Sequence, residues 1–202
     1  MRLGLFGGTF DPVHYAHLLL AERCREQCRL DRVVFVPSAV PPHKRDRKLT
    51  PAPARIEMLE LAIAGHEQLA ISRHEVDRGG VNYTVDTLRH FRDEDLQTEL
   101  FFLLGADMLH DLPSWREADR VCELATIVAV RRAGVAELDF ASLASLVAPE
   151  RIDQFRKHQV EMPVMGLSST EIRGRVAAGL SIRYMTPRAV EKYVAAHALY
   201  CV

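Results

Sequence analysis

The sequence lacks the features that mark several special classes of protein. Its four cysteines form no Cys-x-x-Cys pair, and no stretch approaches the roughly 18 apolar residues that a membrane-spanning helix needs. The apolar run behind the amino terminus covers only Leu3 to Phe6, which is too short for a signal peptide. We therefore expect no disulfide framework, no membrane partner, and reduced thiols in the cytoplasm.

A strong net charge is also missing, because 26 lysines and arginines face 27 aspartates and glutamates. No overall field attracts nucleic acid, so we expect no nucleic-acid partner and look for anion binding in local sites. Internal repeats and low-complexity segments are absent. The remaining composition, 48% hydrophobic and 26% charged over 202 residues, is typical of one globular domain with a sizeable core.

Short apolar runs alternate with segments of helical character along most of the chain. The strand-like runs are Leu3–Phe6, Val33–Val36, Leu69–Ile71, Leu100–Leu104 and Thr126–Val130, and the helical segments are Ala16–Leu30, Ala52–Ala64 and Tyr83–Phe91. Continuous apolar runs of this length are typical of strands buried on both faces. The alternation predicts an α/β fold with a Rossmann-like, doubly wound parallel sheet.

The last part of the chain has a different pattern. It predicts two helices, Thr170–Ala178 ending at Gly179, and Pro187–Ala198 with Thr186 as its N-cap. We therefore divide the chain into a Rossmann-like core, residues 1–165, and a small helical subdomain, residues 166–202, which together form one functional domain.

Four polar or glycine-containing segments follow predicted strands directly. They are Gly7-Gly8, the Pro37–Pro53 loop, Gly105-Ala106-Asp107 and Arg131-Arg132. Because loops after parallel strands gather at the carboxyl edge of a sheet, we expect these segments to meet there around a ligand.

The first of these segments continues as Thr9-Phe10-Asp11-Pro12 and leads into a helix. It is neither a P-loop nor a G-x-G-x-x-G turn, but its glycines allow backbone N–H groups to approach an anion. His14 and His17 then share one face of the helix start. Phosphate contact is favoured for this pair; packing histidines, a tight turn, or a zinc site completed by Cys24 and Cys28 are the alternatives.

A second phosphate-type pattern lies near the other end of the chain. Ser168, Ser169 and Thr170 stand at a helix start, and Arg173 follows about one turn later on the same face. Hydroxyls, free amides and a guanidinium together suit a polyphosphate, whereas the alternative is a capped surface helix.

Other candidates are weaker on their own. Lys44 places a cation on a proline-rich loop, or simply belongs to a solvated basic loop. The amides of Tyr83 and Thr84 suit a carboxylate, although Thr84 or Asn82 can merely cap the helix. Asp107 can accept hydrogen bonds from ribose hydroxyls, and the alternative is that it caps a short helix. Trp115 can stack on a flat ring, and the alternative is that it packs in the core.

Together these motifs resemble a known family. Gly7-Gly8-Thr9-Phe10-Asp11-Pro12-x-His14-x-x-His17 with Ser168-Ser169-Thr170-x-Ile172-Arg173 is similar to the nucleotidylyltransferase superfamily. Pro41-Pro42-His43-Lys44, Tyr83-Thr84-x-Asp86-Thr87-Leu88, Gly105-x-Asp107, Trp115 and Thr186-Pro187-x-x-Val190-x-x-Tyr193 resemble the bacterial nicotinate-nucleotide adenylyltransferases. The family usually has glycine where this chain has Ala16, a change of one methyl group that we interpret as tolerated.

The resemblance implies an enzyme of NAD biosynthesis that joins ATP and nicotinate mononucleotide into deamido-NAD and pyrophosphate. It implies in-line attack without a covalent intermediate, and Mg²⁺ that arrives with ATP and takes no protein ligand. The implied catalytic residues are His14, His17, Lys44 and Arg173. The implied ATP-binding residues are Gly7, Gly8, Thr9, Phe10, His17, Asp107, Ser168, Ser169, Thr170 and Arg173, and the implied substrate-binding residues are His14, Lys44, Tyr83, Thr84, Trp115 and Arg132.

Three other functions stay open at this point. A pantetheine-phosphate or similar nucleotidyltransferase shares the histidine turn, a nucleotide-sensing module can bind ATP without turnover, and a zinc-dependent hydrolase can use the histidines. A homo-oligomer is also open.

Overall fold

The computed structural model describes residues 1–40, 49–132, 134 and 138–201. Within them the chain forms one sheet of six parallel strands in the order β3-β2-β1-β4-β5-β6. The strands are β1 (Arg2–Gly8), β2 (Arg32–Pro37), β3 (Leu69–Ile71), β4 (Glu99–Gly105), β5 (Thr126–Arg132) and β6 (Val160–Met162). The predicted parallel α/β architecture is confirmed, and the short edge strand β6 is added to it.

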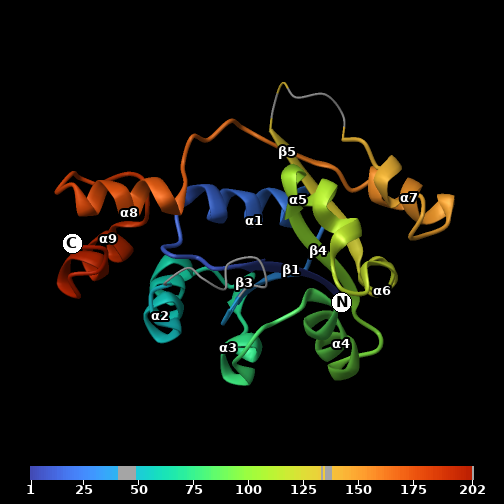
Figure 1. The fold of residues 1–202 in the computed structure, drawn as a ribbon, viewed down its shortest axis with the longest axis horizontal. Helices are drawn as coiled ribbons and strands as arrows, with labels where there is room; N and C mark the ends of the chain where they lie inside the picture. Colours follow the sequence, from blue (N-terminus) through green and yellow to red (C-terminus); the bar gives the residue numbers. More distant parts are fainter. Residues whose placement is uncertain (41–48, 133, 135–137, 202) are drawn as a thin grey trace.

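Helices surround the sheet, with α8 and α9 at one end of the molecule and α7 at the other (Figure 1). The helices are α1 (Tyr15–Gln27), α2 (Ala52–Ile63), α3 (His74–Arg78), α4 (Thr84–Glu94), α5 (Ala106–Asp111), α6 (Ala118–Leu124), α7 (Pro149–Arg156), α8 (Ser169–Ala177) and α9 (Arg188–Ala196), with short 3₁₀ turns η2 (Leu112–Ser114) and η3 (Ala141–Leu143). Across the described part of the chain, no helix has the length and apolar character needed to cross a membrane.

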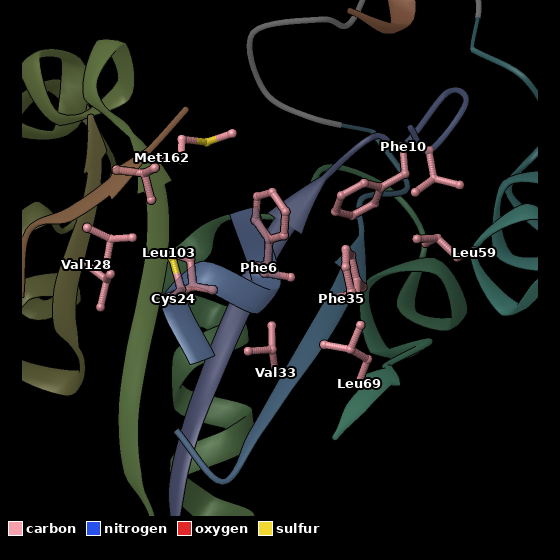
Figure 2. Packing of buried hydrophobic residues seen from close by; sticks show 14 of the residues in the cluster. Phe6, Phe10, Cys24, Val33, Phe35, Leu59, Leu69, Leu103, Val128 and Met162 are labelled. Atoms are coloured by element: carbon pink, nitrogen blue, oxygen red, sulfur yellow. The ribbon is translucent and has the colours of Figure 1, made fainter. Parts of the chain in front are cut away.

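Strand side chains alternate between two hydrophobic clusters, one on each face of the sheet. In β2, Val33 and Phe35 belong to the first cluster, whereas Val34 and Val36 belong to the second. Residues of α1, α2, α8 and α9 complete the first cluster, part of which Figure 2 shows, and residues of α4 to α7 complete the second. Burial on both faces explains why the strands are continuous apolar runs in the sequence.

The start of α9 corrects one prediction. Thr186 is not the N-cap, because the helix begins at Arg188 and Pro187 takes the cap position. The Thr186 side chain is buried, and its hydroxyl donates to the carbonyl oxygen of Val13 at 2.7 Å. This residue therefore fastens the helical subdomain to the segment before α1, since its hydroxyl is used across the interface and not within its own helix.

Candidate active site

A cavity of about 650 Å³ lies at the carboxyl edge of the sheet. Its walls come from the end of β1, the end of β2, the turn between α3 and α4, and the segment from α5 to Arg116. The lining residues include Gly7, Gly8, Thr9, Ser38, Glu75, Asn82, Tyr83, Thr84, Thr87, Met108, Asp111, Ser114, Trp115 and Arg116. Two of the four expected segments therefore line one cavity, Gly7-Gly8 and, through Ser38, the loop after β2. The expectation is wrong for Gly105-Ala106-Asp107, because the helix that follows reaches the cavity with Met108 and Asp111 instead.

The described residues at the end of β5 do not line this cavity either. Arg131 forms an ion pair with Glu161 at 2.6 Å, which joins β5 to β6. Arg132 ends β5, but its side chain lies outside the described part of the structure, as does the whole of Lys44. The roles of Arg132 and Lys44 therefore stay predictions.

The glycine turn brings backbone close to packed side chains. A Cβ atom on Gly8 would lie 2.9 Å from the ring of Phe10, so only glycine fits there. Phe10 has a φ of 47°, and its ring is buried against Phe6 and Phe35. Because that ring is in the core, only the backbone of Phe10 is available to a nucleotide.

The two histidines form a compact stacked pair at the start of α1. His14 is the N-cap, and its backbone N–H donates to Nδ1 of His17 at 3.2 Å. The ring centroids are 3.7 Å apart, and Phe10 packs against His17 from another side. Burial lowers the pKa of His14 to about 4, so its imidazole is neutral at pH 7.

Zinc ligation by these histidines is not favoured by the geometry. Cys24 and Cys28 are buried, and burial raises the pKa of both thiols. Among the described residues no group of three or more His, Cys, Asp or Glu side chains is placed to hold a metal ion.

The start of α8 contacts the turn after β1 directly. The hydroxyl of Ser169 donates to the Pro12 carbonyl oxygen at 2.9 Å, and the guanidinium of Arg173 donates to the Asp11 carbonyl oxygen at 2.6 Å and to Thr170 at 3.2 Å. Ser168 caps the helix by accepting from the Glu171 amide. Two motifs about 160 residues apart in the chain are therefore in direct contact, and their role in phosphate binding stays a prediction.

Among the described residues none of α8 lines the cavity, and the wall between the α3–α4 turn and Arg116 is aromatic. Tyr83 and Thr84 lie at the start of α4, and Trp115 packs edge-on against Phe102 with 6.0 Å between ring centroids. The guanidinium carbon of Arg116 lies 4.7 Å from the centre of the Tyr83 ring. Asp107 is exposed in the first turn of α5 and does not line this cavity.

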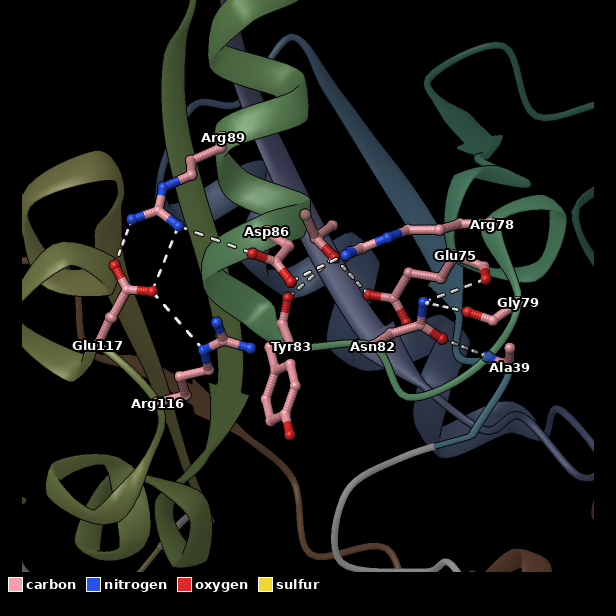
Figure 3. A network of polar contacts seen from close by, with 11 residues as sticks. Ala39, Glu75, Arg78, Gly79, Asn82, Tyr83, Asp86, Arg89, Arg116 and Glu117 are labelled. Atoms are coloured by element: carbon pink, nitrogen blue, oxygen red, sulfur yellow. Dashed lines mark hydrogen bonds and ion pairs between the residues drawn. The ribbon is translucent and has the colours of Figure 1, made fainter.

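A polar network holds the α3–α4 turn in place (Figure 3). Asn82 does not cap α4, because its side chain accepts from the Ala39 amide and donates to the carbonyl oxygens of Glu75 and Gly79. Glu117 pairs with both Arg89 and Arg116, and Arg89 also pairs with Asp86. These contacts fix the aromatic wall relative to the end of β2.

Three residues of this region are missed by sequence reasoning. Glu75 is a buried carboxylate on the cavity wall; it accepts from the Thr87 hydroxyl at 2.6 Å, and burial raises its pKa. Arg116 lines the same cavity. Arg55 is almost fully buried under the β1 turn, and its only sequence signal is that it shares a helix face with the buried Met58 and Leu59.

Comparisons with known proteins agree with this geometry. The cytidylyltransferase-like family model matches residues 5–175. The chain is 48% identical to a probable nicotinate-nucleotide adenylyltransferase of Thermus thermophilus, over 99% of this chain and 100% of that one, and 45% identical to the protein of the same name from Thermomicrobium roseum, over 98% and 91%.

Among solved structures, the Plasmodium falciparum nicotinic acid mononucleotide adenylyltransferase complexed with NaAD is similar in fold. It superposes with a TM-score of 0.76 at 18% identity and covers 98% of this chain and 97% of its own. On the sequence relatives and the family model together, this chain belongs to the cytidylyltransferase-like family and, within it, to the nicotinate-nucleotide adenylyltransferases.

Proposed function

We propose that this chain transfers the adenylyl group of ATP to nicotinate mononucleotide, yielding deamido-NAD and pyrophosphate. One observation carries the proposal: a single cavity extends from the Gly7–Thr9 turn to the aromatic wall of Tyr83 and Trp115. Such a cavity suits a substrate with a phosphate at one end and a flat ring at the other. The names of the sequence relatives point to the same chemistry.

In this reaction a phosphate oxygen of the mononucleotide attacks the α-phosphorus of ATP. A bond forms between that oxygen and phosphorus, the bond to the bridging oxygen breaks, and pyrophosphate leaves with the electron pair. The nucleophile is already an anion, so no general base is required. Mg²⁺ enters as part of the ATP substrate, held by phosphate oxygens and water.

The protein's task is orientation and stabilisation of charge. His14 is neutral at pH 7 and offers an N–H donor without an added cation, and His17 is stacked against it. We assign both rings to the phosphates whose bonds change. Ser169, Thr170 and Arg173 lie beside the same turn and are assigned to the leaving pyrophosphate.

The aromatic wall is assigned to the pyridine ring. Trp115 offers a face for stacking, and the amides at the start of α4 offer donors to a carboxylate. An amide substituent would turn its own N–H groups toward those donors and leave them unpaired. The cation of Arg116 at the rim adds to the preference for an acid.

Turnover of defined substrates tests the proposal. The chain is incubated with ATP, Mg²⁺ and one of nicotinate mononucleotide, nicotinamide mononucleotide or 4′-phosphopantetheine, and both pyrophosphate and the dinucleotide are measured. We expect fastest turnover with nicotinate mononucleotide. Equal turnover of the two mononucleotides would contradict the acid preference, and preference for phosphopantetheine would assign another substrate. ATP binding without pyrophosphate release would indicate a sensor.

A further inference from the structure

Asp11 is a junction between three distant parts of the chain. Only 2% of its surface is exposed. Its backbone carbonyl accepts from Arg173 of α8, and its carboxylate accepts from the Tyr200 hydroxyl at 2.8 Å and from the Thr50 amide at 3.3 Å. The residue that follows Phe10 in the glycine turn is therefore held by α8, by the segment before α2 and by the end of the chain.

Arg55, on α2, holds the same turn from the interior of the protein. Its buried guanidinium donates to the carbonyl oxygens of Thr9 at 2.7 Å, Ser38 at 2.9 Å and Thr50 at 2.9 Å. Burial lowers the pKa of Arg55, and the nearby Asp11 carboxylate opposes that effect. The residues on both sides of Phe10 are thus fixed by partners that lie outside the turn.

Tyr200 reaches Asp11 in a conformation that its contacts must maintain. Its φ is 65°, in the left-handed region that non-glycine residues rarely adopt, and such residues persist where the surroundings hold them. Burial and the neighbouring Asp11 raise the pKa of the Tyr200 hydroxyl, so it stays a protonated donor. Its ring packs against the hydrophobic cluster that contains Phe10.

We propose that Tyr200 is a positioning residue for adenylyl transfer, which through its hydrogen bond to the Asp11 carboxylate keeps the turn from Thr9 to His17 in the geometry that the reaction needs. This inference rests on the proposed function. Neither Tyr200 nor Asp11 lines the cavity described above, so Tyr200 acts through the turn. Small displacements of groups around reacting phosphates are costly, on the order of 10²-fold in rate for about 1 Å.

Tyr193 provides a matched control. Its hydroxyl donates to the carboxylate of Glu57 at 2.7 Å, so it makes the same type of bond from the same end of the chain. That bond is exposed and joins α9 to α2, without a link to the glycine turn. Tyr193→Phe therefore removes an equivalent hydroxyl while Asp11 keeps its partners.

The test compares Tyr200→Phe with Tyr193→Phe in the full chain. For Tyr200→Phe we expect kcat to fall about tenfold, with KM for both substrates within about twofold of wild type. Hydrogen–deuterium exchange of peptides covering residues 9–17 is expected to increase in the same variant. Tyr193→Phe is expected to change neither readout.

A double-mutant cycle with Asp11→Asn adds a second measurement. If the Tyr200 hydroxyl acts through the Asp11 carboxylate, Tyr200→Phe lowers kcat by a smaller factor in the Asp11→Asn background than in wild type. The inference is overturned if both tyrosine variants behave alike, or if the two effects on kcat are additive. A wild-type chain that makes no dinucleotide would contradict the proposed function instead, and the exchange comparison alone would then decide whether Tyr200 holds the turn.

Discussion

At the scale of single residues, His17 is assigned by the proposed function to the phosphates whose bonds change. It stacks on His14 and packs against Phe10, so its ring has a fixed orientation beside the glycine turn. We expect His17→Ala to lower kcat by about 10²-fold or more, because a donor aimed at developing charge is lost. Pyrophosphate release measures this effect. Turnover within a few-fold of wild type would show that the ring does not contact the reacting phosphates.

Trp115 is expected to govern affinity for the pyridine ring. Stacking of a base on an aromatic side chain contributes about 1–3 kcal/mol, so Trp115→Ala should raise KM for nicotinate mononucleotide about tenfold. KM for ATP should change little, because Trp115 lies on the aromatic wall and not beside α8. Trp115→Phe is the control and should keep most of the affinity. Equal KM values for wild type and both variants would show that the pyridine ring does not stack on Trp115.

His14 makes stability depend on pH in a defined direction. Its pKa falls from 6.5 to about 4 on folding, so the unfolded chain binds more protons between these values. This contribution is fully present above pH 6.5 and is lost as pH falls toward 4, by at most about 3 kcal/mol. As pH falls, the His14 ring takes up a proton in the unfolded chain at a higher pH than in the folded chain, where it is buried.

His14→Asn tests this dependence, because asparagine keeps a good N-cap and does not titrate. Urea denaturation of both proteins at pH 7 and about pH 4.5 gives two differences in the free energy of unfolding. We expect the loss between the two pH values to be smaller in the variant. Equal losses would mean that His14 titrates normally in the folded chain.

At the scale of whole elements, Arg55 connects α2 to three loops through its three carbonyl contacts. Arg55→Met removes the guanidinium donor from those part-buried oxygens, and we expect a loss of about 3 kcal/mol in the free energy of unfolding, seen as a lower urea midpoint. Arg55→Lys should recover only part of that loss, because one ammonium cannot reach three carbonyl groups. A loss below about 1 kcal/mol in Arg55→Met would contradict the bridging role.

Arg151 gives the corresponding control for an element far from the site. Its Nε donates to the Cys122 carbonyl oxygen at 2.9 Å and its side chain is half-buried between α6 and α7. Arg151→Met should lower stability as well, but it should leave kcat unchanged. Arg55→Met should lower kcat even at a temperature where the variant is fully folded.

The sequence predicted the elements whose pattern is local and long. The five main strands and the helices α1, α2, α4, α8 and α9 all lie where apolar periodicity or cap residues place them, within a few residues. The short helices α3, α5, α6 and α7 were not predicted, because elements of five to eight residues depend on packing more than on intrinsic preference. For Thr186, a good local cap residue forms a tertiary contact instead.

The candidate site was predictable only where its residues form motifs. The glycine turn, the histidine pair and the start of α8 were visible as local patterns. The parallel topology placed the glycine turn and the loop after β2 at one edge of the sheet, but it did not predict the contact between α8 and the glycine turn. Arg55, Glu75 and the bond between Tyr200 and Asp11 were not visible, because each is defined by partners far away in the sequence. Charged side chains in a helix are normally solvated, and the helix face that Arg55 shares with Met58 and Leu59 was the one local sign of its burial.

At the scale of the whole molecule, we expect the product to stabilise the fold by contacting two parts of the site at once. Deamido-NAD carries both a pyridine ring and an adenylyl group. Under the proposed assignments it is expected to contact the aromatic wall of the cavity and the start of α8 beside the glycine turn. At about 100 times its Kd it should stabilise the fold by about 2.7 kcal/mol, a Tm increase of roughly 5–10 °C for a chain of this size. Differential scanning calorimetry measures it.

Adenosine alone and nicotinate mononucleotide alone are the comparison ligands. Each occupies only part of the proposed site, and each should raise Tm less than the dinucleotide at the same concentration. If saturating deamido-NAD leaves Tm unchanged, the product does not bind the folded chain and the cavity is not the site of this reaction.

The contact between Tyr200 and Asp11 also decides how the protein should be handled in the laboratory. The Tyr200 hydroxyl bonds to Asp11 in the turn after β1, whereas Met1 lies at the opposite edge of the sheet, next to the amino end of β1. A purification tag fused after Val202 would therefore follow closely on the residue that is proposed to hold the turn. An amino-terminal tag is the appropriate design, and comparing kcat between the two tagged forms would show how far the end of the chain takes part in the work of the enzyme.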